Sequence, residues 1–69
     1  MNVRVTKLFC CCYENRVIVI DSNLLEFHKT FEIIEPNSFS YRWFGAKFKE
    51  SKTFNHSING KQYTFQQLV

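Results

Sequence analysis

The feature that most constrains this chain is its aromatic content within a short length. Eight Phe, three Tyr and one Trp lie within 69 residues that include only two Gly and one Pro. A chain of this length supports one small hydrophobic core, and large rings bury the most area, so we expect the rings to supply much of it. The composition is too apolar for intrinsic disorder, and the length excludes a multi-domain enzyme. We therefore predict a single domain over residues 1–69.

Two hairpins are predicted at the ends of the chain. β-Branched and aromatic residues dominate residues 2–13 and 16–20, and the polar pair Glu14-Asn15 between them is typical of a turn. Near the C-terminus, Asn59-Gly60 separates HSI from KQYTF, the pattern of a two-residue type I′ turn. These patterns predict a mainly β fold, with an α+β class left open: a small antiparallel sheet or partly open barrel with at most one short helix.

The middle of the chain carries two competing patterns. Across residues 25–33 apolar and polar residues largely alternate, which predicts a half-buried strand. The same segment places Leu24, Phe27 and Phe31 at helical spacing behind Ser22 as an N-cap, so a helix is the alternative.

Residues 39–48 are predicted to form the next strand. Tyr41 and Trp43 would lie on one face, and the phase slips at Gly45, as a β-bulge allows. A short helical turn over residues 46–52 is the alternative.

Positive charge is concentrated in the second half of the chain. The formal net charge is +3 overall. Residues 1–36 carry −1, whereas residues 37–69 hold five Lys and Arg against Glu50 alone, a net charge of +4. An anionic partner is therefore expected to meet the second half. The alternative is that these cations only keep an aromatic-rich segment soluble.

Aromatic and basic residues are interleaved in this half, and they are the candidate binding residues. Single-stranded nucleic acid uses both kinds, rings for base stacking and cations along the phosphates. Tyr, Trp and Arg also dominate protein-binding hot spots. The alternative is that most of the rings belong to the core. The candidates are Tyr41, Arg42, Trp43, Lys47, Lys49 and Lys52.

Three consecutive cysteines are the oddest local feature. On a strand, Cys10 and Cys12 face one way and Cys11 the other, and an odd cysteine count does not favour a disulfide framework. Together with His28 and His56 they lack the usual zinc-ligand spacings, so we expect no metal and no cofactor. The cysteines are expected to pack as small apolar residues.

No motif in the sequence indicates catalysis or membrane insertion. Gly-rich phosphate loops, nucleophile elbows and HExxH are missing, so we predict that the protein is not an enzyme. The longest apolar run, Leu8 to Tyr13, has six residues, too few to span a membrane or to form a signal peptide. We expect a cytoplasmic protein without a membrane partner.

From Ile20 onward the chain carries, in this order, the segments IDSNLLEF, the strand KTFEII, YRWFG and SKTFNHSINGKQYTFQQL, within residues 20–68. In their order these segments resemble the landmarks of the KTSC family. The family's Ser-Asn opening corresponds to Ser22-Asn23, and its central Tyr-x-Tyr to Tyr41-Arg42-Trp43. The family's helix before the Ser-Lys segment is almost deleted here, and residues 1–19 have no counterpart. KTSC domains occur alone in bacterial proteins and at the C-terminus of some lysyl-tRNA synthetases. RNA binding is suggested for them, so the resemblance implies a fold and a lean toward nucleic acid.

Composition also indicates an origin. Phe, Tyr, Met, Ile, Asn and Lys, which AT-rich codons encode, occupy 29 of 69 positions, as in many phages and mobile elements. By elimination, we predict a non-enzymatic binding protein that binds and inhibits a host defence or regulatory protein in the host cytoplasm. The alternative is an RNA-binding or single-stranded DNA-binding domain that uses the aromatic-basic half. A third hypothesis is a cysteine-dependent or zinc-dependent function at Cys10 to Cys12. The sequence predicts no oligomeric state.

Overall fold

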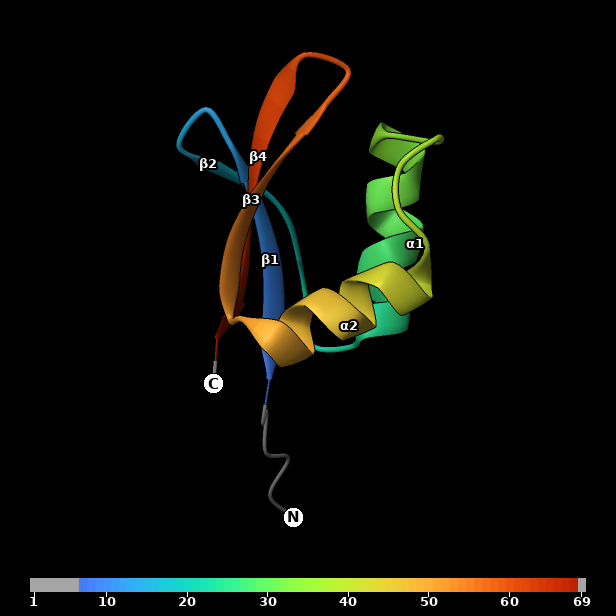
Figure 1. The fold of residues 1–69 in the computed structure, drawn as a ribbon, viewed down its shortest axis with the longest axis vertical. Helices are drawn as coiled ribbons and strands as arrows, with labels where there is room; N and C mark the ends of the chain where they lie inside the picture. The colour runs from blue at the N-terminus through green and yellow to red at the C-terminus, as the bar shows by residue number, and fades with distance from the viewer. Residues whose placement is uncertain (1–6, 69) are drawn as a thin grey trace.

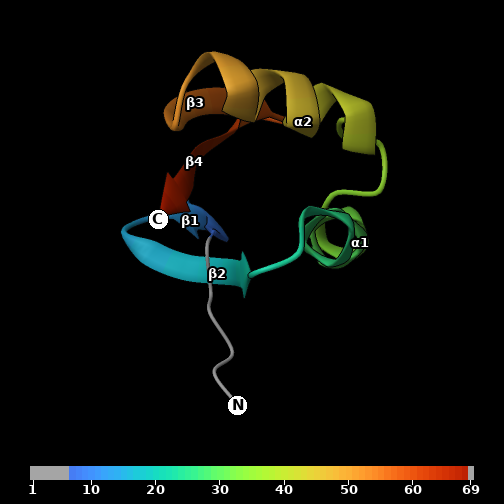
Figure 2. The same ribbon diagram turned by 90° about the horizontal axis from the view of Figure 1, so that it is seen from below.

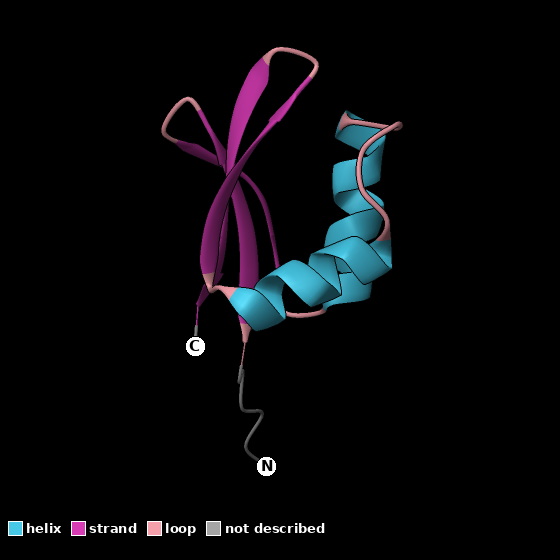
Figure 3. Ribbon diagram, viewed as in Figure 1, coloured by secondary structure: helices cyan, strands magenta, loops and turns pink. Residues whose placement is uncertain are grey.

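A computed structural model describes residues 7–68 and contains one sheet and two helices. Neighbouring strands are all antiparallel, in the order β2-β1-β4-β3. Both helices lie on the same side of the sheet (Figure 1, Figure 3), which curls toward them without closing into a barrel (Figure 2). The elements are β1 (Leu8–Tyr13), β2 (Arg16–Asp21), α1 (Leu24–Ile34), α2 (Tyr41–Glu50), β3 (Thr53–Ile58) and β4 (Lys61–Leu68).

The predicted small antiparallel sheet and both predicted hairpins are confirmed. Each hairpin has a two-residue turn in which both residues have positive φ, at Glu14 (51°) and Asn15 (64°) and at Asn59 (53°) and Gly60 (78°). Positive φ at both central residues is the requirement of a type I′ turn, whose twist matches that of the flanking strands. The two hairpins then meet through β1 and β4 in the centre of the sheet.

Aromatic rings fill the space between the sheet and the helices. Phe31 of α1 packs edge to face against Phe44 of α2, with ring centroids 5.8 Å apart, and against Phe65 of β4, at 5.4 Å. Edge-to-face pairs are the arrangement that ring quadrupoles favour. The buried core residues are Phe9, Cys11, Val19, Phe27, Phe31, Phe44, Phe48, Ile58, Tyr63 and Phe65.

The strand predicted for residues 25–33 is wrong, because this segment forms most of α1. Phe27 and Phe31 lie one helical turn apart and are fully buried. Leu25 and Ile33 continue the apparent alternation in the sequence but are 44% and 81% exposed. The helical spacing of the two Phe residues therefore decides the conformation, and the period of two in the sequence is coincidental.

The N-terminus of α1 is capped one residue later than Ser22, the residue that the helical alternative predicts. The Asn23 side-chain oxygen accepts hydrogen bonds from the backbone N–H of Leu25 at 2.8 Å and of Glu26 at 3.1 Å. Asn23→Ala should therefore lower the free energy of unfolding by about 1 kcal/mol, whereas Ser22→Ala should change it by less than about 0.5 kcal/mol. Urea unfolding measures both, and equal losses would contradict this assignment of the cap.

The strand and the bulge at Gly45 predicted for the next segment are also wrong, because this segment forms α2. The Ser40 hydroxyl caps the helix by accepting a hydrogen bond from the Trp43 N–H at 3.1 Å. Phe44 and Phe48, four residues apart, both face the core. The expectation of at most one short helix fails with this second helix.

Candidate functional site

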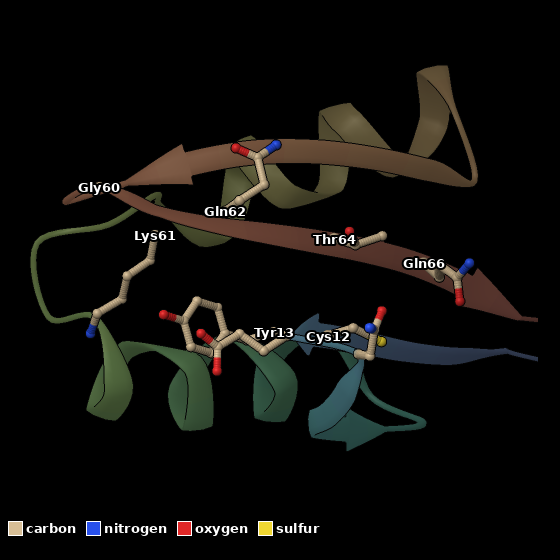
Figure 4. Close-up of a pocket in the computed structure, with 9 residues that line it drawn as sticks. Cys12, Tyr13, Gly60, Lys61, Gln62, Thr64 and Gln66 are labelled. Atoms are coloured by element: carbon tan, nitrogen blue, oxygen red, sulfur yellow. The ribbon is translucent and has the colours of Figure 1, made fainter.

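Two surface hollows are candidates for a site, and the first lies mainly on the sheet face away from the helices. It has a volume of about 650 Å³, and Figure 4 shows Thr64 and Gln66 of β4 beside Cys12 of β1 in its wall. Some of its polar groups bind neighbouring side chains: the Thr64 hydroxyl donates to the Asn55 side-chain oxygen at 2.8 Å, and the Cys10 thiol donates to Gln66 Oε1 at 3.8 Å. These groups of the wall do not need a ligand.

Cys10 and Cys11, which lie beside this hollow, are poor candidates for chemistry. Burial, with smaller contributions from the neighbouring thiols, raises the pKa of Cys11 to about 12 and also raises the pKa of Cys10. Both thiols are therefore protonated at neutral pH, and a protonated thiol is a weak nucleophile and a weak metal ligand. Within residues 7–68, no three His, Cys, Asp or Glu side chains come close enough to hold a metal ion.

The second hollow, called the α2 groove here, lies where α2 crosses the end of β1 and β4. Its volume is about 590 Å³. Its apolar lining consists of Phe9, Leu24, Gly45, Ala46 and Phe48, and its polar lining consists of Lys7, Tyr41, Arg42, Lys49 and Gln67.

The α2 groove has a strongly positive rim. Lys7, Arg42 and Lys49 line it, no acidic side chain of the described residues does, and none of these cations forms an ion pair within residues 7–68. Tyr41 is 45% exposed beside them. These three cations around a low-dielectric floor reinforce one another's field, so the groove attracts negative charge.

Only three of the six sequence-predicted candidates line the α2 groove. A helix advances 100° per residue, so Tyr41, Arg42 and Lys49 lie on the groove side, whereas Trp43 and Lys47 lie on the opposite flank of α2. The sixth candidate, Lys52, is exposed between α2 and β3, outside the groove lining.

Trp43 belongs to the edge of the core and does not form an open stacking platform. Its ring stacks on Phe39 with centroids 3.6 Å apart and an interplanar angle of 16°. Phe54 and His56 contact it edge on, and Lys47 Nζ lies 5.7 Å from its centroid. Most of the ring surface is therefore already in contact with the protein, so stacking on a nucleobase would require these contacts to break.

Sequence reasoning missed the part of the groove that comes from outside α2. Lys7, Phe9 and Gln67 reach it from the ends of β1 and β4, and Leu24 reaches it from the start of α1. Helical spacing of Tyr41, Gly45 and Lys49 could have identified the α2 side. No local pattern could have identified the other residues, because the tertiary fold brings them together, in part through the antiparallel pairing of β1 with β4.

A buried carboxylate connects the end of α1 to the β3–β4 hairpin through hydrogen bonds and an ion pair. Glu35 is 4% exposed and accepts hydrogen bonds from Tyr63 Oη at 2.6 Å and Asn59 Nδ2 at 3.0 Å, and Lys61 Nζ lies 3.6 Å away. The hydrogen bond from Tyr63, then that from Asn59 and the charge of Lys61, lower the pKa of Glu35. Burial and the bond to Glu35 raise the pKa of Tyr63. The partners of this carboxylate all come from the fold, which favours a structural role.

The interactions of the Glu35 carboxylate should make the free energy of unfolding sensitive to acid. A lowered pKa in the folded state stabilises the fold above the ordinary value of 4.5, and this stabilisation is lost as pH falls through the lowered pKa. We expect the wild-type unfolding free energy to fall more steeply below pH 4.5 than that of Tyr63→Phe, which lacks the largest cause of the shift. Urea unfolding at a series of pH values measures the slopes, and parallel slopes would contradict the prediction.

Comparison of the chain with protein families, curated proteins and solved structures finds no match. The KTSC resemblance therefore stays a prediction, although residues 29–34, the KTFEII segment, are helical here. No helix within residues 7–68 is both long and apolar enough to cross a bilayer.

Proposed function

We propose that this protein is a non-enzymatic binding protein that holds an acidic surface or segment of another protein in the α2 groove. The observation that carries the proposal is the makeup of the groove: an exposed Tyr and three cations that form no ion pair within residues 7–68 surround an apolar floor. Tyr and Arg side chains at the rim of an apolar pocket are the residue types of protein-binding hot spots. Binding and inhibition of a host defence or regulatory protein belongs to the same proposal and rests on composition.

An acidic segment with an apolar anchor suits the groove better than a bare anion. Phe9, Leu24 and Phe48 line a floor that removes apolar side chains from water. Lys7, Arg42 and Lys49 then lie around the anchor, where carboxylates on either side of it can form charge-assisted hydrogen bonds. The expected ligand is a Glu-rich or Asp-rich segment that carries a Leu or an aromatic residue.

Nucleic-acid binding is the alternative, and it uses the same cations. Single-strand binders stack successive bases on exposed rings, at about 1–3 kcal/mol per base. Of the two rings predicted for this purpose, Trp43 is packed against Phe39 and only Tyr41 remains exposed. The arrangement of the rings therefore favours the protein partner.

Selection from a random peptide display library tests the proposal through the chemistry of the peptides that bind. Wild-type protein should enrich acidic sequences with an apolar anchor, and Arg42→Glu protein should not. Enrichment of sequences without acidic residues would contradict the proposal. So would tight binding of oligo(U) or oligo(dT) with a steep salt dependence and without peptide enrichment, which would favour the alternative.

Capture from a lysate then identifies the natural partner. Tagged wild-type protein is incubated with nuclease-treated and untreated halves of a lysate of the source cell or its host, and retained proteins are identified by mass spectrometry. A protein retained in near-stoichiometric amount after nuclease treatment is the expected result. If every protein retained from the untreated half is absent from the nuclease-treated half, the result would indicate RNA binding instead.

A further inference from the structure

β2 is an outer strand with an apolar face and an unpaired edge. It pairs with β1 on one side and, within residues 7–68, with no strand on the other. Val17 and Ile20 are 57% and 54% exposed. An exposed apolar edge strand is a template for pairing with another chain unless charges, Pro or a covering element block it.

A β-bulge gives this strand an unusual arrangement of faces. Cys11 pairs with Val19 and Cys12 with Val17, so Ile18 is the extra residue opposite β1. In a regular strand, residues three apart face opposite sides of the sheet. Here Ile20 lies opposite Cys10, which shares a face with Cys12, so the bulge places Val17 and Ile20 on the same face.

The same reasoning applies to the two ends of the strand. Arg16 lies opposite Tyr13, and Asp21 lies opposite Phe9, whose ring packs in the core. Tyr13 and Phe9 both lie on the helix-covered side of β1, so Arg16 and Asp21 also share a face. The side chains along β2 therefore alternate between the two faces of the sheet in the same order whether the strand is followed from residue 16 or from residue 21.

A symmetric pattern of faces permits pairing of β2 with its own copy around a two-fold axis. In such an antiparallel pair centred between Ile18 and Val19, residue 16 lies opposite residue 21, and residue 17 opposite residue 20. Directly opposite residues must share a face, and without the bulge this register would place them on different faces. The bulge is thus what makes the register available.

The side chains in this register are complementary. Arg16 of each copy lies opposite Asp21 of the other, which gives an ion pair at each end, and the exposed Val17 lies opposite the exposed Ile20. The Asp21 carboxylate is oriented by a hydrogen bond from the Asn23 N–H at 3.0 Å. From this complementarity we infer that β2 is a homodimer interface, at which the sheets of two copies join into one continuous antiparallel sheet.

This interface is separate from the proposed binding groove. Residues 16–21 of β2 contribute nothing to the lining of the α2 groove. Dimerisation and peptide binding can therefore fail independently, and a variant of one surface serves as a control for the other.

Sedimentation velocity over a concentration series tests the homodimer with a pair of charge reversals. Wild-type protein should show a reversible monomer–dimer equilibrium. Arg16→Asp and Asp21→Arg each place like charges opposite one another at both ends of the pair, so each should raise the dimer Kd by about tenfold or more. An equimolar mixture of the two variants should recover the dimer, because the mixed pair has opposite charges at both contacts.

Further variants distinguish pairing through β2 from association through a different surface. Val17→Lys should also abolish the dimer, whereas Thr53→Lys on β3, the other outer strand, should leave it intact. Circular dichroism checks that each variant is folded. If Asp21→Arg unfolds because it loses the hydrogen bond from the Asn23 N–H, Val17→Lys still tests the interface. A monomeric wild-type protein at the highest concentration, a mixture of folded charge variants that stays monomeric, or a dimer that Thr53→Lys disrupts would overturn the inference.

Discussion

Phe44→Ala should unfold the domain, whereas Tyr41→Ala, three residues earlier in the same helix, should leave it folded. Phe44 is fully buried and contacts Phe27, Phe31 and Phe65. Removal of a buried Phe ring costs about 3–5 kcal/mol. The total stability expected for a chain of this length is roughly 3–10 kcal/mol, so the loss is comparable to the whole.

Tyr41→Ala is the matched comparison because its ring lies at the rim of the α2 groove and is 45% exposed. Surface substitutions of this kind usually change stability by less than about 0.5 kcal/mol. Urea unfolding followed by the fluorescence of Trp43, the one Trp in the chain, measures both variants. Equal destabilisation of the two would contradict the placement of Phe44 in the core and of Tyr41 at the rim of the groove.

The double reversal Arg42→Glu with Lys49→Glu should abolish binding of the selected acidic peptides, with a rise in Kd of about hundredfold or more. Both side chains are exposed and line the groove, so the substitutions leave the core untouched. They replace attraction by repulsion at two of the three groove cations, and like charges at an interface cost several kcal/mol. Fluorescence anisotropy with a labelled peptide measures the change.

The matched control is the double reversal Lys47→Glu with Lys52→Glu. It changes the net charge by the same amount and uses two other members of the sequence-predicted cluster, but neither residue lines the groove. Peptide binding should weaken by less than about tenfold, through long-range electrostatics that salt screens. An equal loss of binding in both double variants would mean that total charge, and not the groove, determines affinity.

The terminal hairpins could be predicted from sequence because their determinants are local. Asn59-Gly60 and Glu14-Asn15 adopt positive φ. Each of these turn pairs and the β-branched and aromatic residues beside it lie within a few positions of one another in the sequence. The mainly β class and the antiparallel sheet follow from these hairpins.

The two helices could not be predicted from periodicity because their segments satisfy two periods at once. Phe27 and Phe31 are four residues apart, which fits the same face of a helix and also the same face of a strand. Burial by the sheet decided the conformation, together with the caps at Asn23 and Ser40, whose side chains accept the first free N–H groups. Cap residues before each Phe pair were the local evidence for helices.

Only half of the predicted site residues line the groove, because their segment was predicted to be a strand and forms a helix. A strand would have placed Tyr41 and Trp43 on one face, whereas the helix sends Trp43 to the core edge and Tyr41 to the groove. Lys7 joins Arg42 and Lys49 only through tertiary folding. Sequence therefore identified the segment that carries the charge, but not the surface that the charge lines.

Mapping of the bound peptide by NMR tests the central claim, that the α2 groove is the binding surface, most directly. Titration of ¹⁵N-labelled protein with a selected acidic peptide should shift the amides of Tyr41, Arg42, Gly45, Lys49 and Gln67, which surround the groove from α2 and from β4. Amides of β2 and of the open sheet face around Thr64 should stay in place. Shifts confined to the open face, or spread over all exposed cations without a cluster at the groove, would contradict the claim.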